Sequence, residues 1–253
     1  MVKLFEHKFW GKSIGDLLEW IEVSSKSNWI FLDIETTGLK SDPYEIQITQ
    51  ISCISTKFNL DKVEFQEVET FNKKIKLTDK TKSIFGRPDS RVKKILSFNR
   101  YGQKGTSYQE EDLVLDELSK FIQKSDKLVI QNASFDMGFL NTRSDIRFKN
   151  EVIDTKQIIQ LFFIPTIQKL SETDPKYKDM IDKIGTSGRD SGLISSSMGK
   201  IGPALGINMT GYHDGLVDCR LTMDMMSRII RILKENQKLD ISQYQSQRIK
   251  IIK

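Results

Sequence analysis

An apolar run that ends in two carboxylates constrains this chain more than any other stretch. Residues 29–38 read WIFLDIETTG, so Asp33 and Glu35 stand two positions apart near the end of the run. In a β-strand such a pair projects from one face of the sheet, while the residue between them packs on the other face. Two carboxylates held side by side need a cation, and no basic residue lies between Lys26 and Lys40. The run therefore indicates either a metal-binding strand end or a partly exposed strand whose polar face is acidic.

Length and composition favour one elaborated α/β domain. The chain has 253 residues, of which 38% are hydrophobic, and this is enough to bury a substantial core. The formal net charge is +5, but residues 73–104 hold eleven basic and two acidic side chains, a local net charge of +9. Contact with nucleic acid, a solvated face and a disordered loop are all compatible with such a segment. We favour contact with nucleic acid, because phosphate groups attract clustered Lys and Arg.

Histidine and cysteine are scarce. Cys53 and Cys219 have no CxxC spacing, which argues against a disulfide framework and against a zinc cluster. The two histidines, His7 and His213, are too few for a site with several imidazole ligands. The first residues lack the apolar core of a signal peptide, and no apolar run approaches the roughly 20 residues that span a bilayer. We therefore expect a soluble, cytoplasmic protein.

The pattern of hydrophobic residues divides the chain into three parts. We expect an N-terminal helical extension over residues 1–28, the main domain over 29–235 and a polar basic tail over 236–253. Two insertions are expected inside the main domain. They are the basic one at about 73–104 and a polar, glycine-containing one at about 171–197, which could act as a lid.

Alternating and helical patterns predict the individual elements. The acidic run and two further strands, over 45–58 and 63–71, are typical of an antiparallel meander, and short strands follow at 128–130 and 151–155. Helices are expected over residues 11–22, 90–98, 108–123 and 156–163, and a last helix ends at about residue 233. Pro165 is expected to end the helix at 156–163.

Two further acids stand where helices begin. Asp136 falls in the first turn of a helix that follows the short strand at 128–130, although the helix dipole alone would favour an acid there. His213 and Asp218 are five residues apart, which on one helix would separate them by about 140°. For both side chains to face one site, His213 must lie in the loop before the helix, and neighbouring glycines permit that turn.

Three motifs, in this order along the chain, resemble those of the DEDDh family of 3′-to-5′ exonucleases, also called DnaQ-like. They are Asp33-x-Glu35, Asn132-x-x-Phe135-Asp136 and His213-x4-Asp218. The resemblance covers residues 29–233 and implies an RNase H-like α/β fold, with a mixed five-stranded sheet whose first three strands are antiparallel and with helices on both faces. The chain departs from the family in its two insertions and at Gly215, where members more often carry Ala.

The resemblance also implies the roles of five residues. Asp33, Glu35, Asp136 and Asp218 would hold two divalent ions, with Asp33 bridging them. Oxygen ligands of this kind select Mg²⁺ or Mn²⁺ over softer metals. His213 would be the general base, since an unperturbed pKa near 6.5 suits removal of a proton from the attacking water at neutral pH.

Contacts with the substrate are implied for a further set of residues. The candidates near the terminal nucleotide are Thr36, Thr37, Leu39, Asn132 and Phe135. The charge density of the basic segment, and not the resemblance, adds Arg91, Lys93 and Lys94 as contacts with the backbone of the nucleic acid. Phenylalanine at such a position is more often a core residue than a platform for a base. Phe135 could therefore belong to the core or contact the substrate.

The predicted function is hydrolysis of DNA from its 3′ end, with single strands preferred and nucleoside 5′-monophosphates released. RNA as the substrate is an open alternative. A second alternative is a catalytically silent module that binds nucleic acid or a polymerase, but all five catalytic positions are filled. A metal-dependent nucleotide phosphatase is a weaker alternative, because a mononucleotide does not need so basic a segment. Besides nucleic acid with a free 3′ end, the sequence leaves open a polymerase or another replication protein as partner.

Overall fold

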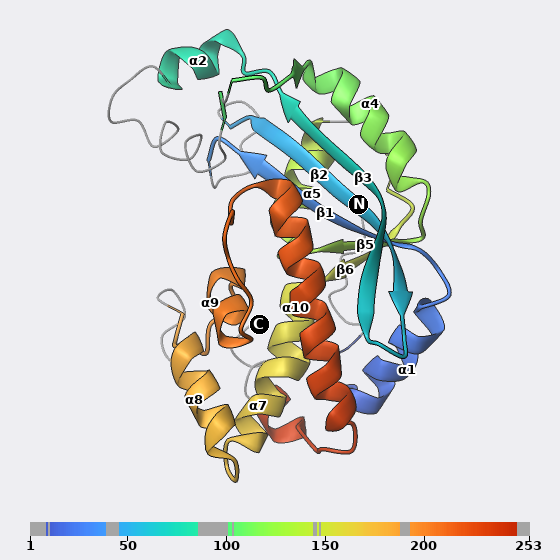
Figure 1. Ribbon diagram of the computed structural model, residues 1–253, viewed down its shortest axis with the longest axis vertical. Coiled ribbons are helices and arrows are strands. Elements are labelled where there is room, and N and C mark those ends of the chain that lie inside the picture. Colours follow the sequence, from blue (N-terminus) through green and yellow to red (C-terminus); the bar gives the residue numbers. More distant parts are fainter. Residues whose placement is uncertain are drawn as a thin grey trace.

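One mixed β-sheet organises the chain (Figure 1). The computed structural model describes residues 9, 11–38, 46–85, 101–102, 104–143, 146, 148–187 and 193–246. The sheet has the strand order β4-β3-β2-β1-β5-β6. Its strands are β1 (Trp29–Thr36), β2 (Ile48–Asn59), β3 (Glu64–Ile75), β4 (Tyr108–Gln109), β5 (Lys127–Ile130) and β6 (Glu151–Asp154).

Strand pairing gives the sheet an antiparallel half and a parallel half. β2 is antiparallel to both β1 and β3, whereas β5 is parallel to β1 and β6 is parallel to β5. The predicted mixed sheet with three antiparallel first strands is therefore confirmed, but the sheet has six strands and not five. The additional strand, Tyr108–Gln109, pairs in parallel with the end of β3 and is too short to show any alternation in the sequence.

Helices cover both faces of the sheet. On one face lie α1 (Ile14–Ser24) and α10 (Gly215–Glu235), and on the other lie α4 (Glu111–Ile122) and α5 (Ala133–Arg143). The predicted helix at 108–123 thus begins three residues late, because β4 occupies its first residues. In Figure 1, α10 crosses in front of the sheet. Among the residues that the structure describes, no helix combines the length and the hydrophobicity needed to cross a bilayer.

Side-chain alternation along β1 decides which face receives the acidic pair. Trp29 and Phe31 belong to the core beneath α1 and α10, whereas Ile30, Leu32 and Ile34 belong to the core beneath α4 and α5. The odd-numbered residues that follow continue the first row, because successive side chains of a strand point to opposite faces. The two acids of β1 are therefore presented on the side of α10.

The helix that was expected to end before Pro165 continues to residue 170. It consists of α6 (Thr155–Ile158), a π-helix (Ile159–Phe163) and α7 (Ile164–Leu170). In a regular α-helix the proline ring would clash with the carbonyl group of Leu161, and the wider π turn accommodates it. The Leu161 oxygen instead accepts a hydrogen bond of 2.8 Å from Nε2 of Gln245, a buried residue of the predicted tail. The tail is thus packed against the domain as far as this residue.

The predicted polar insertion at 171–197 contains regular structure. Asp174 caps helix α8 (Pro175–Ile184), because its carboxylate accepts the backbone N–H of Lys176 at 2.9 Å. An isolated bridge joins Thr186 to Ile194, and α9 (Met198–Ala204) follows. Residues 188–192 lie outside the described part of the chain, and the role of this insertion as a lid stays a prediction.

Candidate active site

The first two carboxylates project from the end of β1 into the space beside α10. Burial raises the pKa of Asp33 well above its ordinary value, and the charges of Glu35, Asp136 and Asp218 raise it further. The pKa of Glu35 is raised to about 8, again chiefly by burial and then by the neighbouring acids, while Lys74 opposes the rise. This strand end therefore concentrates negative charge in a poorly solvated place.

Asp136 reaches the same place from the first turn of α5. The side chain is 3% exposed, and its Oδ1 accepts the backbone N–H of Ile34 at 3.0 Å, directly between the two acids of β1. Burial raises the pKa of Asp136, although this hydrogen bond acts in the opposite direction. The helix start and the strand end are thus joined through the carboxylate itself.

The third motif spans the loop before α10 and its first turn. His213 lies in the loop with a φ angle of +73°, and its backbone N–H donates to both oxygens of Asp218, at 3.2 and 3.3 Å. The helix begins at Gly215, so His213 precedes it, as the five-residue spacing required. Burial raises the pKa of Asp218 to about 7. Asp214 caps the helix by accepting the N–H of Leu216 at 3.2 Å.

The three motifs meet at one point. Glu35, His213 and Asp218 each offer a ligand atom, and these atoms all lie within 4.8 Å of one another. Asp33 and Asp136 belong to the same cluster of charges, because, in addition to burial, Glu35, Asp136 and Asp218 raise the pKa of Asp33, and Asp136 also raises the pKa of Glu35. Oxygen-rich clusters of this kind fit hard divalent cations, because a bound cation relieves the repulsion that raises the carboxylate pKa values. The residues present therefore fit divalent metal ions.

Gly215 allows α10 to approach the sheet closely. A Cβ atom at this position would lie 2.8 Å from Oγ of Ser52 and 3.3 Å from Oδ2 of Asp33. Ser52 is the register partner of Asp33 on β2 and is fully buried. The resemblance leads one to expect Ala at this position, but the Ser52 hydroxyl group occupies the space that its methyl group would need. This contact explains why the chain has Gly here.

Three further polar residues of the site were missed by the sequence analysis. The ring of Tyr212 stacks on that of His213, with centroids 4.0 Å apart and planes inclined by 26°. Burial and the nearby acids raise the pKa of Tyr212 to about 12. Asp154, at the end of β6, accepts the backbone N–H of Asn132 at 3.0 Å, and burial raises its pKa. Asp154 and the capping acid Asp214 both directly precede a helix, which is the signal that could have found them.

Thr36, the last residue of β1, and Thr37, the first residue after it, are two of the predicted substrate contacts, and both are buried. Thr36 Oγ1 donates to the carbonyl oxygen of Gly38 at 2.5 Å. Thr37 Oγ1 accepts the N–H of Gln47 at 3.0 Å, and the Thr37 N–H donates to the Gln47 carbonyl at 2.9 Å. Both hydroxyl groups therefore shape the turn from within.

The other candidate contacts lie at the start of α5 or outside the described residues. Oδ1 of Asn132 accepts a hydrogen bond of 3.0 Å from Nζ of Lys156. The Phe135 ring lies 5.1 Å from that of Phe139 and packs against the core beneath α4 and α5, which favours its core reading. The structure does not describe Leu39, Arg91, Lys93 or Lys94, nor the predicted helix at 90–98.

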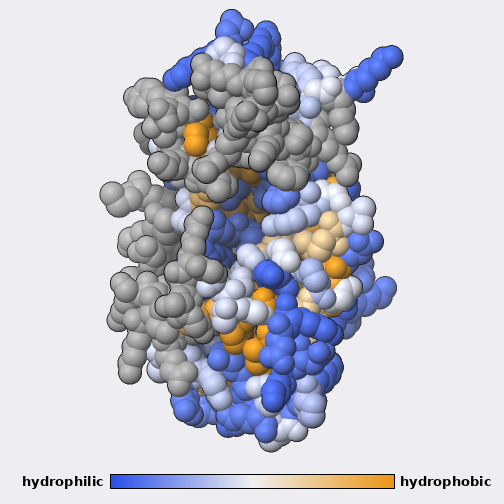
Figure 2. All heavy atoms as spheres, turned by 90° about the vertical axis from the view of Figure 1, so that its left-hand side faces the viewer, coloured by the Kyte–Doolittle hydropathy of each residue, from blue (hydrophilic) through white to orange (hydrophobic). Residues whose placement is uncertain are grey.

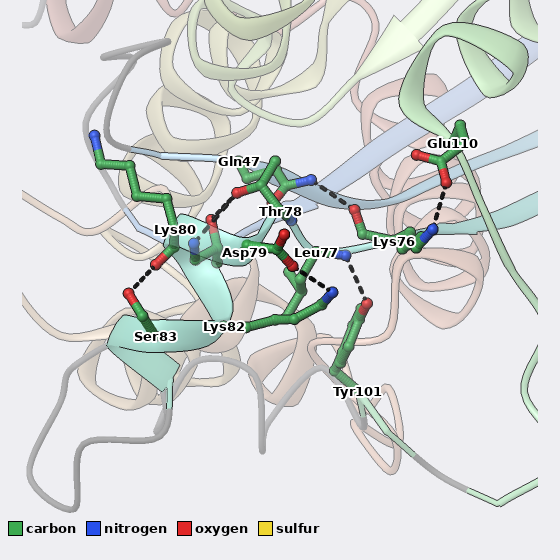
Figure 3. Close-up of polar contacts among 11 residues, drawn as sticks. Gln47, Lys76, Leu77, Thr78, Asp79, Lys80, Lys82, Ser83, Tyr101 and Glu110 are labelled. Carbon is green, nitrogen blue, oxygen red and sulfur yellow. Dashed lines mark hydrogen bonds and ion pairs between the residues drawn. The ribbon is translucent and has the colours of Figure 1, made fainter.

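The described start of the basic segment is rich in ion pairs (Figure 3). Lys76 contacts Glu110 at 2.7 Å, and Lys82 contacts Asp79 at 3.0 Å. The side chain of Gln47 bridges the backbone of this segment, because its Nε2 donates to the Lys76 carbonyl at 2.8 Å and its Oε1 accepts the Thr78 N–H at 3.0 Å. These contacts tie the segment to the turn after β1.

The face toward which β1 ends in Figure 1 is seen from the front in Figure 2. Hydrophilic atoms lie in a hollow near the middle of that view.

Without divalent ions, the folded protein is expected to lose stability as the pH rises from about 5 to 8. The folded-state pKa values of Glu35 (about 8) and Asp218 (about 7) lie above their ordinary values, so in this window the folded state binds more protons than the unfolded chain. The lowered pKa of His213, caused by burial, acts in the opposite direction but below about pH 6.5. Melting temperatures measured in EDTA at a series of pH values test this.

Saturating Mn²⁺ should reverse the trend, because the ion competes with protons and stabilises the folded state more at pH 8 than at pH 5. Glu35→Gln is the matched variant, and its melting temperature in EDTA should depend less on pH. A melting temperature in EDTA that is flat or rising from pH 5 to 8 in the unmodified protein would contradict the expectation.

Comparisons with known proteins agree with this geometry. The sequence model of the RNase_T exonuclease family matches residues 30–226. The complex of E. coli exonuclease I with a dA16 oligonucleotide superposes with a TM-score of 0.54 at 16% identity, covering 83% of this chain and 42% of that chain. The zinc-bound complex of E. coli exonuclease I with single-stranded DNA gives 0.54 at 15% identity, covering 86% and 42%. The product-bound form of exonuclease I gives 0.53 at 16% identity, covering 83% and 45%.

The chain thus spans less than half the length of the exonuclease I chains that it matches. At these identities the likeness establishes the fold. No functionally curated protein matches the sequence significantly.

Proposed function

Because the chain belongs to the RNase_T exonuclease family, whose sequence model matches residues 30–226, we propose that it is a 3′-to-5′ exonuclease. It is a nuclease, and its family implies divalent metal ions. In this proposal it hydrolyses DNA from the 3′ end, prefers single strands, releases nucleoside 5′-monophosphates and uses two Mg²⁺ or Mn²⁺ ions.

One observation carries the proposal: the four carboxylates and the histidine converge at the end of β1 from three separate elements. Asp33, Glu35, Asp136 and Asp218 would hold the ions, which supply positive charge that offsets charge on the scissile phosphate. The raised pKa values of these acids support this role, since a site that binds no cation gains nothing from clustering them.

His213 would accept a proton from the attacking water. The lowered pKa of its imidazole, caused by burial, keeps the ring neutral near pH 7, and the neutral ring is the form that takes up a proton. The stacked ring of Tyr212 and the hydrogen bond from the His213 backbone to Asp218 hold the residue beside the carboxylates. Although its imidazole is partly desolvated, His213 as a whole residue is exposed, which leaves it open to an incoming substrate.

We favour DNA over RNA because exonuclease I, a protein of similar fold, has been solved in complex with dA16 and with single-stranded DNA. That binding is a property of exonuclease I. RNA stays the main alternative, because no described residue of this chain distinguishes the two sugars. A polymerase or another replication protein as partner, and contact of Leu39, Arg91, Lys93 and Lys94 with the substrate, also stay predictions.

Degradation of end-labelled oligonucleotides tests the polarity and the substrate. Single-stranded DNA and RNA of one sequence, labelled at the 5′ end, are incubated with the protein in Mg²⁺, Mn²⁺ or EDTA. We expect a descending ladder from the DNA, with 5′-mononucleotides as products, and no cleavage in EDTA. A circular single strand is the matched control, and its cleavage at a comparable rate would exclude an exonuclease. Binding without cleavage in either metal would favour the catalytically silent module.

A further inference from the structure

A row of polar side chains continues from the acids of β1 across β2 to β3. The register aligns Glu35 with Gln50 and Lys74, and it aligns Asp33 with Ser52 and Asn72. Residues that pair directly across antiparallel strands lie on the same face of the sheet. The row therefore lies on the side of α10, as the acids do, and Lys74 stands at its far end, two strand spacings or about 10 Å from Glu35.

Hydrogen bonds hold the middle of this row in place. Ser52 Oγ donates to Oδ1 of Asn72 at 3.0 Å, and Nε2 of Gln50 donates to the same oxygen at 2.8 Å. Gln50 and Ser52 are buried, whereas Asn72 is exposed. The buried Gln50 and Ser52 thus position Asn72, and the exposed Asn72 and the half-buried Lys74 are the two residues of β3 in this row that a ligand can reach.

Lys74 acts on a carboxylate of the candidate active site, whereas the lysines near it pair with carboxylates elsewhere. Its field lowers the pKa of Glu35, so it brings positive charge to the site. Its neighbour Lys73 points to the opposite face and pairs with Glu117 of α4 at 2.8 Å. Farther along, Lys76 pairs with Glu110 at 2.7 Å. Strand parity therefore directs Lys74, and not Lys73, toward the carboxylates.

A nucleic acid strand needs such a charge at this place. The strand is a polyanion, and it must approach a site where four carboxylates already repel one another. Bound ions would offset charge at the scissile phosphate, so the next phosphate would need a cation from the protein itself. β1 and β3 run in the same direction and both end toward α2 (Asp79–Phe85) in Figure 1. Lys74 is the second residue of the basic segment at 73–104, so the end of β3 and this segment are continuous.

We propose that Lys74, with Asn72 beside it, binds the phosphate adjacent to the scissile one, on its 5′ side, so that the strand leaves the site past these two residues of β3. This inference rests on the proposed function and names the path of its substrate. The ligand is a phosphodiester of single-stranded nucleic acid, recognised by its charge and not by its bases.

Two substrates distinguish binding of the adjacent phosphate by Lys74 from an effect of Lys74 on the reaction centre. One is a single-stranded oligothymidylate, and the other is the p-nitrophenyl ester of thymidine 5′-monophosphate, which has one phosphodiester and no adjacent phosphate. The measured quantity is the ratio of kcat/KM for the oligonucleotide to kcat/KM for the ester. For Lys74→Ala we expect this ratio to fall roughly tenfold, because only the oligonucleotide loses a charged contact. Lys74→Arg should restore most of this ratio, since the charge is kept.

Binding gives a readout that does not need turnover. The affinity of the protein for a fluorescent oligothymidylate is measured by anisotropy in EDTA over a series of KCl concentrations. The slope of log K against log salt should become less steep by about one in Lys74→Ala, as expected for one phosphate contact. Lys73→Ala removes the same charge from the opposite face of the same strand, and it should behave as the unmodified protein in both assays.

The outcomes distinguish the two proposals. An equal loss on oligonucleotide and ester would show that Lys74 acts through Glu35, and an unchanged salt slope would show that it contacts no phosphate. Either result overturns the subsite. If the unmodified protein hydrolyses neither substrate, the proposed function fails, while the salt slopes of Lys74→Ala and Lys73→Ala still decide whether Lys74 binds the strand.

Discussion

Asp33→Asn is expected to abolish divalent-ion binding and turnover together. The substitution keeps the shape of the side chain and removes one charge from the point where the fields of Glu35, Asp136 and Asp218 overlap. Hard divalent ions are held by charge and oxygen ligands, so the loss should be felt by every ion bound there. Calorimetric titration with Mn²⁺ should show no saturable binding, and release of mononucleotides should fall to the level seen in EDTA.

The metal-free variant should nevertheless be folded and, near pH 8, more stable than the unmodified protein. The reason is that removal of one buried carboxylate relieves the repulsion among the others. A higher melting temperature in EDTA thus separates loss of ligands from loss of structure. Full activity or an unchanged Mn²⁺ titration would show that Asp33 is not a ligand.

His213→Ala should fail in a different way. All four carboxylates stay in place, so metal and substrate should still bind, while the rate falls by the general-base contribution, typically 10²- to 10⁴-fold. The residual rate should also lose its dependence on a group that titrates near neutrality. Single-turnover rates between about pH 6 and 9, beside a Mn²⁺ titration, measure both effects.

The proximity of His213 to Glu35 and Asp218 makes the Mn²⁺ titration decisive. If His213→Ala loses metal binding as completely as Asp33→Asn does, the imidazole is a ligand and not the base. If the variant keeps a near-native rate, another group or the solvent accepts the proton. Weaker activity with intact metal binding is the one result that agrees with the proposed role.

The parts of the site that the sequence predicted depend on local geometry. The two-residue period of a strand placed both acids of β1 on one face, and the helical period placed His213 in the loop before its helix. Asp136 followed from its position after a short strand. In each case neighbouring residues along the chain contained the information.

The parts that could not be predicted depend on contacts between distant segments. Pro165 does not end its helix, because a π turn and the side chain of Gln245 accommodate it. Strand β4 exists through its pairing with the end of β3 and not through its own pattern. The direction of Lys74 toward the acids follows from the strand register, which the sequence does not encode locally.

The double use of Gln47 has a mechanical consequence. The Gln47 backbone forms hydrogen bonds with Thr37, and the Gln47 side chain forms hydrogen bonds with the backbone of Lys76 and Thr78. One residue thus connects two loops that are remote in sequence. These hydrogen bonds connect the turn to the start of the basic segment directly, without passing through the intervening strands. If the turn binds the terminal nucleotide, as predicted for Thr36 and Thr37, these hydrogen bonds would connect that end of the substrate site to the described start of the basic segment.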